Sequence, residues 1–130
     1  MDTSEAYIQM CDCEEIQQTW APIVGDYCNP REGFLGHLDS NFVDILYEGH
    51  DVYIDAVRCK QQSVFLPRQD QLQEMVGLDL DKLLTRFHYW EDGSGFIKER
   101  DELFSMEQLW LAFVMFQLYS KKWDGTKWTG

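Results

Sequence analysis

The stretch Leu109-Trp-Leu-Ala-Phe-Val-Met-Phe-Gln-Leu-Tyr119 would be apolar on every face of a helix. Such a helix cannot lie half in water, so it must be surrounded by protein. Because it is about half as long as the roughly 20 apolar residues that cross a bilayer, it predicts a central core helix or an oligomer seam. Ser105 and Gln108 match a capping box, so we expect the helix to begin next to Ser105.

Length and composition indicate an ordered globular chain. With 130 residues, of which 45% are hydrophobic and 15% aromatic, the chain fits a single domain over residues 1–130 with its own core. The first residues have neither the basic flank nor the apolar run of a signal peptide. We therefore expect a cytoplasmic protein in which the four cysteines are reduced thiols.

The charge is unevenly distributed along the chain. The net charge is −12, and twelve acidic residues between Met1 and Val57 face the single base Arg31, whereas eight of the eleven bases follow Leu66. Such a field repels polyanions, which disfavours direct binding to nucleic acid or to an anionic membrane. A basic protein is the electrostatic complement of the acidic half, and a merely solubilising surface is the simpler alternative.

The hydrophobic periodicity predicts an α+β fold with a helix before a sheet and about three helices after it. A helix is expected from Thr3 to about Thr19, because apolar residues recur there at three- and four-residue intervals. Alternation then predicts a small antiparallel sheet of three to five strands, for which an SH3-like barrel is one arrangement. The expected strands are 26–28, 34–38, 42–47, 52–56 and 63–66.

Helical signals return after Leu66. A short helix follows Pro67 and should end at Gly77, and a second should begin at Asp79 or Asp81 and end at Asp92-Gly93. The remaining expectations are a mobile connector over Gly93–Leu103, the helix after Ser105, and a fold-back at an Asp-Gly turn within Trp123–Trp128.

Candidate chemical groups are scattered rather than clustered. Cys11 and Cys13 would point about 200° apart on one helix, so their sulfurs could not share a metal ion. His37 with Asp39 allows an acid–base or metal site, although nothing in the spacing requires one. We therefore predict no catalytic, cofactor-binding or metal-binding residue. A guanidinium is a good ligand for phosphate, although ion pairs with the chain's own acidic residues are the simpler role for its arginines. The arginines that could bind phosphate are Arg31, Arg58, Arg68, Arg86 and Arg100.

The strands expected at 42–47 and 52–56 are joined by a tight connection over Glu48–Asp51, and the acidic residues around this expected hairpin form the candidate protein-binding surface. Carboxylates at strand positions between apolar residues normally face water, and those at the turn concentrate negative charge over a short distance. The candidate residues are Asp39, Asp44, Glu48, Asp51 and Asp55.

Three groups of sequence blocks are distinctive: Met10-Cys11 with Glu15-Ile-Gln17, Trp20, Pro22 and Gly25-Asp26; Leu66–Met75; and Ser105–Met115 with Trp123–Trp128. Together they resemble a family of small uncharacterised proteins from phages and prophages of Gram-positive bacteria. The resemblance covers about half the chain and implies a phage origin, but it brings no assigned activity. The sequence departs from the family pattern at Phe116-Gln117 and over Phe34–Tyr53.

The favoured hypothesis is a non-enzymatic phage accessory protein that binds a host protein. Its carboxylates would occupy a basic nucleic-acid channel of a defence or nucleic-acid enzyme, where phosphates normally lie. The alternative is an oligomer, for example a homodimer, that sequesters a nucleotide signal in a pocket lined by aromatic residues and a few arginines. A small enzyme comes third, because no catalytic constellation is evident.

Overall fold

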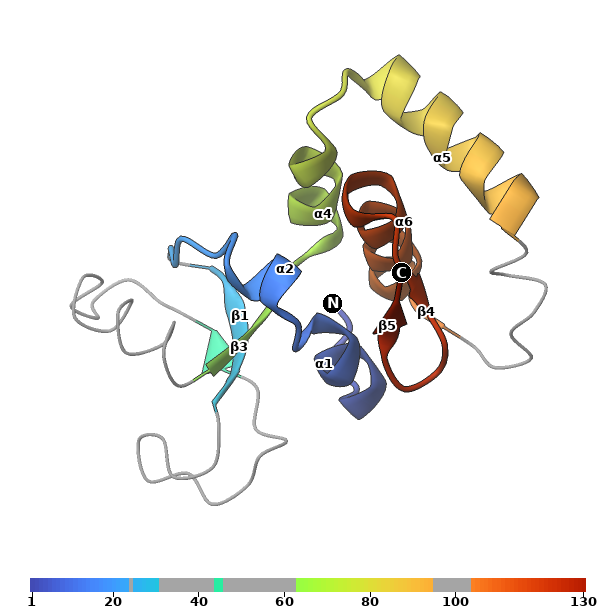
Figure 1. The fold of residues 1–130 in the computed structure, drawn as a ribbon. Coiled ribbons are helices and arrows are strands. Elements are labelled where there is room, and N and C mark those ends of the chain that lie inside the picture. Colours follow the sequence, from blue (N-terminus) through green and yellow to red (C-terminus); the bar gives the residue numbers. More distant parts are fainter. Residues whose placement is uncertain (24, 31–43, 46–62, 95–103) are drawn as a thin grey trace. The chain divides into compact units, whose positions relative to one another are not determined.

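The computed structural model describes residues 1–23, 25–30, 44–45, 63–94 and 104–130 (Figure 1). These residues form helices and antiparallel strands, so the predicted α+β class is confirmed. They belong to two compact units, Thr3–Arg68 and Met1–Asp2 with Gln69–Gly130, which we call the N-terminal and C-terminal units and describe one at a time. The single domain over 1–130 stays a prediction. In the described ranges, no helix is long and apolar enough to cross a membrane.

The N-terminal unit begins with two short helices, α1 (Glu5–Cys11) and α2 (Glu14–Gln17). The prediction of one helix from Thr3 to about Thr19 is therefore wrong. Cys13 interrupts the helical path with an extended backbone (φ −138°, ψ 152°). The side-chain amide of Gln17 donates to the Cys11 carbonyl oxygen at 2.8 Å, which satisfies an acceptor at the end of α1 and stabilises the break.

Three strands of the N-terminal unit form an antiparallel sheet in the order β2-β1-β3 (Figure 1). They are β1 (Tyr27–Pro30), β2 (Asp44–Ile45) and β3 (Ser63–Leu66), and Cys28 is in register with Asp44 on one side and Phe65 on the other. The strand at 63–66 is confirmed, β1 lies slightly later than predicted, and β2 covers two residues of the strand expected at 42–47. The strands expected at 34–38 and 52–56 lie outside the described residues.

The side chain of Gln17 pairs with β3 as a strand residue would. The Phe65 N–H donates to Gln17 Oε1 at 2.8 Å, and Gln17 Nε2 donates to the Phe65 carbonyl oxygen at 3.1 Å. In an antiparallel ladder, alternate residues turn these groups away from the partner strand, so a side-chain amide can satisfy them. The Trp20 ring stacks on Phe65 with centroids 5.1 Å apart. Gln17 of α2 and Trp20, which follows this helix, thus both contact β3.

A buried carboxylate links the end of this helical segment to the sheet. Asp26 is only 1% exposed, and its Oδ2 accepts hydrogen bonds from Trp20 Nε1 at 3.0 Å and from the Ile23 N–H at 2.9 Å. Arg68 Nη1 lies 3.5 Å from Asp26 Oδ1 and donates to the Gly25 carbonyl oxygen at 2.9 Å. The buried negative charge is therefore both hydrogen-bonded and paired, as burial of a charge requires.

The C-terminal unit contains the three predicted helices, α4 (Gln69–Val76), α5 (Leu80–Ser94) and α6 (Met106–Tyr119). α4 packs against α6 (Figure 1). Gly77 follows α4 with a left-handed φ of 74°, as predicted for a helix end. Asp79 Oδ1 accepts from the Lys82 N–H at 3.0 Å and so caps the start of α5. Gly93 and Ser94, expected in a connector, belong to the last turn of α5, and the rest of the expected connector lies outside the described residues.

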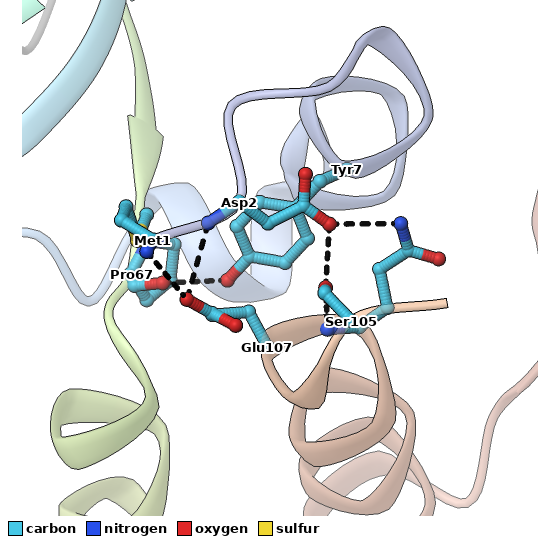
Figure 2. Close-up of polar contacts among 7 residues, drawn as sticks. Met1, Asp2, Tyr7, Pro67, Ser105 and Glu107 are labelled. Atoms are coloured by element: carbon cyan, nitrogen blue, oxygen red, sulfur yellow. Dashed lines mark hydrogen bonds and ion pairs between the residues drawn. The ribbon is translucent and has the colours of Figure 1, made fainter. Parts of the chain in front are cut away.

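The core helix α6 begins where the sequence predicts. The Gln108 N–H donates to Ser105 Oγ at 3.0 Å, and all eight residues from Gln108 to Met115 are buried. The Gln108 side chain departs from the expected capping box, because its amide donates to Asp2 Oδ2 at 2.9 Å. The Ser105 hydroxyl also donates to Asp2 Oδ2, and the Asp2 N–H donates to Glu107 Oε1 at 3.1 Å (Figure 2). A carboxylate thus lies at the N-terminal end of α6, where the helix dipole favours negative charge.

Figure 2 also shows a contact within the N-terminal unit, in which the Tyr7 hydroxyl donates to the Pro67 carbonyl oxygen at 2.6 Å. Tyr7 belongs to α1, and Pro67 directly follows β3. This hydrogen bond ties the first helix to the end of the sheet.

A two-stranded hairpin follows α6 and contains the predicted Asp-Gly turn. Its strands are β4 (Lys122–Trp123) and β5 (Trp128–Thr129), whose tryptophan rings lie across from each other with centroids 5.0 Å apart. Asp124 Oδ1 accepts from the N–H groups of Thr126 and Lys127, both at 2.8 Å. These two hydrogen bonds lower the pKa of the Asp124 carboxyl, because they favour its ionised form.

Candidate ligand-binding site

Helix α5 contacts α6 along one stripe of its surface. Leu83 is buried, the Phe87 ring stacks on Trp110 with centroids 4.1 Å apart, and Trp90 lies 5.4 Å from Phe113. The spacing of Leu83, Phe87 and Trp90 places them on one helix face. Arg86, Tyr89 and Gly93 also recur at three- and four-residue intervals, on the neighbouring face of α5. They therefore lie beside the contact with α6 and not within it.

A cavity of about 400 Å³ lies beside this contact, within the C-terminal unit, and we call it the α5–α6 cavity. Its volume is near the lower end of the range of about 300–1,000 Å³ that small-molecule sites occupy, so it suits one small ligand. Its lining comes from α5, the end of α6 and the first residue of β4: Arg86, Tyr89, Trp90, Gly93, Phe116, Gln117 and Lys122.

Aromatic rings are exposed at this cavity. Tyr89 is 71% exposed and Phe116 is 39% exposed, although large rings usually bury most of their surface. Trp90 lines the same cavity and also contacts the core through Phe113. Its neighbours hold the Trp90 ring in place, while Tyr89 and Phe116 offer surface to a planar ligand.

Two positive charges line the same cavity. Arg86 and Lys122 form no ion pair with any residue that the structure describes, whereas Arg68 and Lys82 are paired with Asp26 and Asp79. Guanidinium and ammonium groups are good ligands for anions, so both side chains suit an anionic ligand.

Gln117 adds a neutral polar group to the lining. Its side-chain amide offers both hydrogen-bond donors and an acceptor. Planar, cationic and amide groups in one small cavity can bind an anionic aromatic molecule.

The structure places one of the five acidic residues predicted to bind protein. Asp44 lies on β2, in register with Cys28 of β1. The other four, Asp39, Glu48, Asp51 and Asp55, lie outside the described residues. The acidic protein-binding surface therefore stays a prediction.

The cysteines near the N-terminus differ in exposure, as expected, but not for the expected reason. Cys11 ends α1 and is buried, whereas Cys13 lies in the break before α2 and is partly exposed. The assumption that both lie on one helix is wrong. Partial burial and, to a smaller extent, the nearby Glu15 carboxylate raise the pKa of the Cys13 thiol to about 11. Among the described residues, no three His, Cys, Asp or Glu side chains lie together in a way that could hold a metal ion.

Sequence reasoning found only part of this cavity. Arg86 is among the arginines considered as phosphate ligands, and its spacing to Tyr89 and Gly93 on a predicted helix is a signal that sequence alone could have used. Phe116 and Gln117 stand out only as a departure from the phage family pattern. Lys122 gives no local signal, because the return of the chain after α6 brings it to the cavity.

No protein-family model matches the chain, and neither a curated protein nor a solved structure matches it. The interpretation of the site therefore rests on the geometry of the cavity and on its chemistry.

Proposed function

We propose that the protein is a non-enzymatic binding protein that sequesters a small anionic ligand with a planar ring. The observation that carries this proposal is the α5–α6 cavity, where exposed aromatic rings and two cations without an ion pair among the described residues line one space of about 400 Å³. Sequestration requires recognition of the ligand, and the lining offers aromatic, cationic and amide groups for it.

Gly93 allows a direct test of this function. A Cβ added at Gly93 would meet no atom within 4 Å, so a larger side chain can enter at this position without a clash. Gly93→Leu should obstruct the cavity, whereas Gly93→Ala adds a single carbon and serves as the matched control. Both changes replace a helical glycine with a better helix former, so the fold should tolerate them.

The experiment is equilibrium dialysis of the purified protein against the small-molecule fraction of a bacterial lysate, followed by mass spectrometry. The original protein and Gly93→Ala should enrich the same compound, and Gly93→Leu should enrich it at least about tenfold less. Equal enrichment by all three proteins, or no enriched compound, would contradict the proposed function.

A second candidate function is supported by the distribution of charge. Twelve acidic residues precede Val57 with one base among them, and Asp44 lies on β2 of the sheet. In this proposal the protein is a phage accessory protein in the cytoplasm of a host cell. Its acidic residues bind a host protein with a basic nucleic-acid-binding surface, and the strands around β2 extend into a sheet of up to five strands, for which an SH3-like barrel is one arrangement.

Charge reversal tests this second function. Changing Asp44, Glu48 and Asp55 together to Lys should weaken binding to a basic host protein recovered by pull-down and reduce the salt dependence of association, because exposed charges act over about 8 Å at physiological salt. Full affinity of the triple variant at low salt would reduce the acidic segment to a solubilising surface.

A further inference from the structure

We infer that the ligand of the α5–α6 cavity is a mononucleotide, whose phosphate is bound by Arg86 and Lys122 and whose base packs on the exposed rings of Tyr89 and Phe116. This inference rests on the proposed ligand-binding function and specifies its ligand. It assigns a role to each kind of side chain that lines the cavity.

The charge of the lining matches a phosphate monoester. Such a group carries about −1.5 to −2 charges at pH 7, and Arg86 and Lys122 supply two positive charges. The whole chain carries −12, so its long-range field repels anions and gives no general affinity for them. Binding of a phosphate must then come from local cations, and charge-assisted hydrogen bonds from guanidinium and ammonium groups are the strong ones.

The rings and the amide match a nucleobase. Every kind of base can stack on an aromatic side chain, because every base presents a π face. Tyr89 and Phe116 expose such surface at the cavity, although burial would be favourable for both rings. Gln117 supplies donors and an acceptor for the edge of a base.

The size of the cavity favours one nucleotide over a polymer. A volume of about 400 Å³ suits a single small molecule, and the strongly acidic chain disfavours the additional phosphate contacts that a nucleic-acid strand needs.

Calorimetric titration can test the inference directly. The probes are the four common ribonucleoside monophosphates and their parent nucleosides, titrated into the full chain at low ionic strength. At least one monophosphate should bind at least about tenfold more tightly than its nucleoside. A hydrogen bond to a charged group strengthens binding by about tenfold or more.

Matched variants separate the local effect from net charge. Arg86→Gln with Lys122→Gln should lower the affinity for the monophosphate to that for the nucleoside, while nucleoside binding, which reports an intact cavity, stays unchanged. Lys82→Gln with Lys127→Gln also removes two positive charges, one from α5 and one from the turn between β4 and β5, at residues that do not line the cavity. This control should keep the preference for the monophosphate.

Three outcomes would overturn the inference: no monophosphate binds, monophosphate and nucleoside bind equally well, or the control pair weakens binding as much as the cavity pair. The proposed function survives each of them if Gly93→Leu still abolishes enrichment of another compound in the dialysis experiment. It fails separately if that enrichment does not depend on Gly93.

Discussion

At the scale of single residues, the buried Asp26 carboxylate makes the clearest energetic prediction. Asp26→Ala removes the acceptor of two hydrogen bonds and the partner of Arg68. We expect urea denaturation to show a loss of about 3 kcal/mol, the lower end for a broken buried pair, because Arg68 is partly exposed and can be hydrated. Asp26→Asn retains an acceptor oxygen and should lose less. A loss below about 1 kcal/mol in the alanine variant would show that the network adds little.

The raised pKa of Cys13 predicts a poorly reactive thiol. With a pKa of about 11, the folded protein holds far less thiolate at pH 8 than an unfolded chain does. Iodoacetamide should therefore modify Cys13 at least about tenfold more slowly in the folded protein, as measured by peptide mass spectrometry. Because the folded-state pKa is raised, this group's contribution to stability is complete below about pH 9 and is lost as the pH rises through 11. Equal rates in folded and urea-unfolded protein would contradict the assigned environment.

The sequence predicted those residue roles that depend on near neighbours. Ser105 and Asp79 bond to N–H groups three residues away, and Gly77 supplies a local left-handed turn, so short motifs were sufficient. Gln17 and Asp2 bond to residues 48 and more than 100 positions away. No short motif encodes such partners, because only the complete fold brings them together.

At the scale of elements, the burial of α6 predicts a large difference between two of its phenylalanines. Phe113 is fully buried and its ring meets those of Phe87, Trp90 and Trp110, whereas Phe116 is partly exposed one turn later. Phe113→Ala should cost about 3–5 kcal/mol in chemical denaturation. Phe116→Ala, the matched control, should cost less than about 1 kcal/mol. Similar losses in the two variants would contradict the arrangement of α6.

The hairpin of β4 and β5 should respond to acid through Asp124. The folded-state pKa of this carboxyl is lowered, so its stabilising contribution is present above the ordinary value of about 4 and is lost as the pH falls through the lowered value. The amide proton resonances of Thr126 and Lys127 should shift in that range in NMR spectra, because both groups donate to Asp124. Asp124→Asn should abolish the titration step, and its persistence would assign it to another carboxyl.

Periodicity identified most elements, but not which side of each was buried or where each was interrupted. The burial of α6 was predictable because its residues are apolar on every face of the helix, so the prediction did not depend on which face contacts the core. On α5, Leu80 and Leu84 shared the apolar pattern with Leu83, yet both are exposed. The face of α5 that contacts α6 depends on where the rings of α6 lie, and the sequence of α5 carries no information about those positions.

At the scale of the whole molecule, each of the two units contains about half of the 130 residues. A domain of about 60 residues is only marginally stable alone, because it buries a smaller share of its unfolded surface than a larger domain does. We therefore expect both units to unfold in one transition. Hydrogen exchange with mass spectrometry during urea titration can follow β3 and α6 separately, and two midpoints would contradict the single domain predicted from the sequence.

The α+β class followed from composition and periodicity, since the change from helical to alternating spacing near the middle of the first half is visible in the chain. The candidate site was only partly accessible. Its α5 residues share a recognisable spacing, whereas Phe116 and Lys122 complete the lining through tertiary packing.

The position of Asp2 has a consequence for folding during synthesis. The N-terminal unit, Thr3–Arg68, is continuous in the chain, so the contacts within it need no residue that is synthesised after Arg68. The C-terminal unit includes Asp2, whose carboxylate meets Ser105 more than 100 residues later. At synthesis rates of about 5–20 residues per second, Ser105 is added to the chain roughly 5–20 seconds after Asp2. Asp2 is therefore synthesised early but reaches its contacts with α6 late.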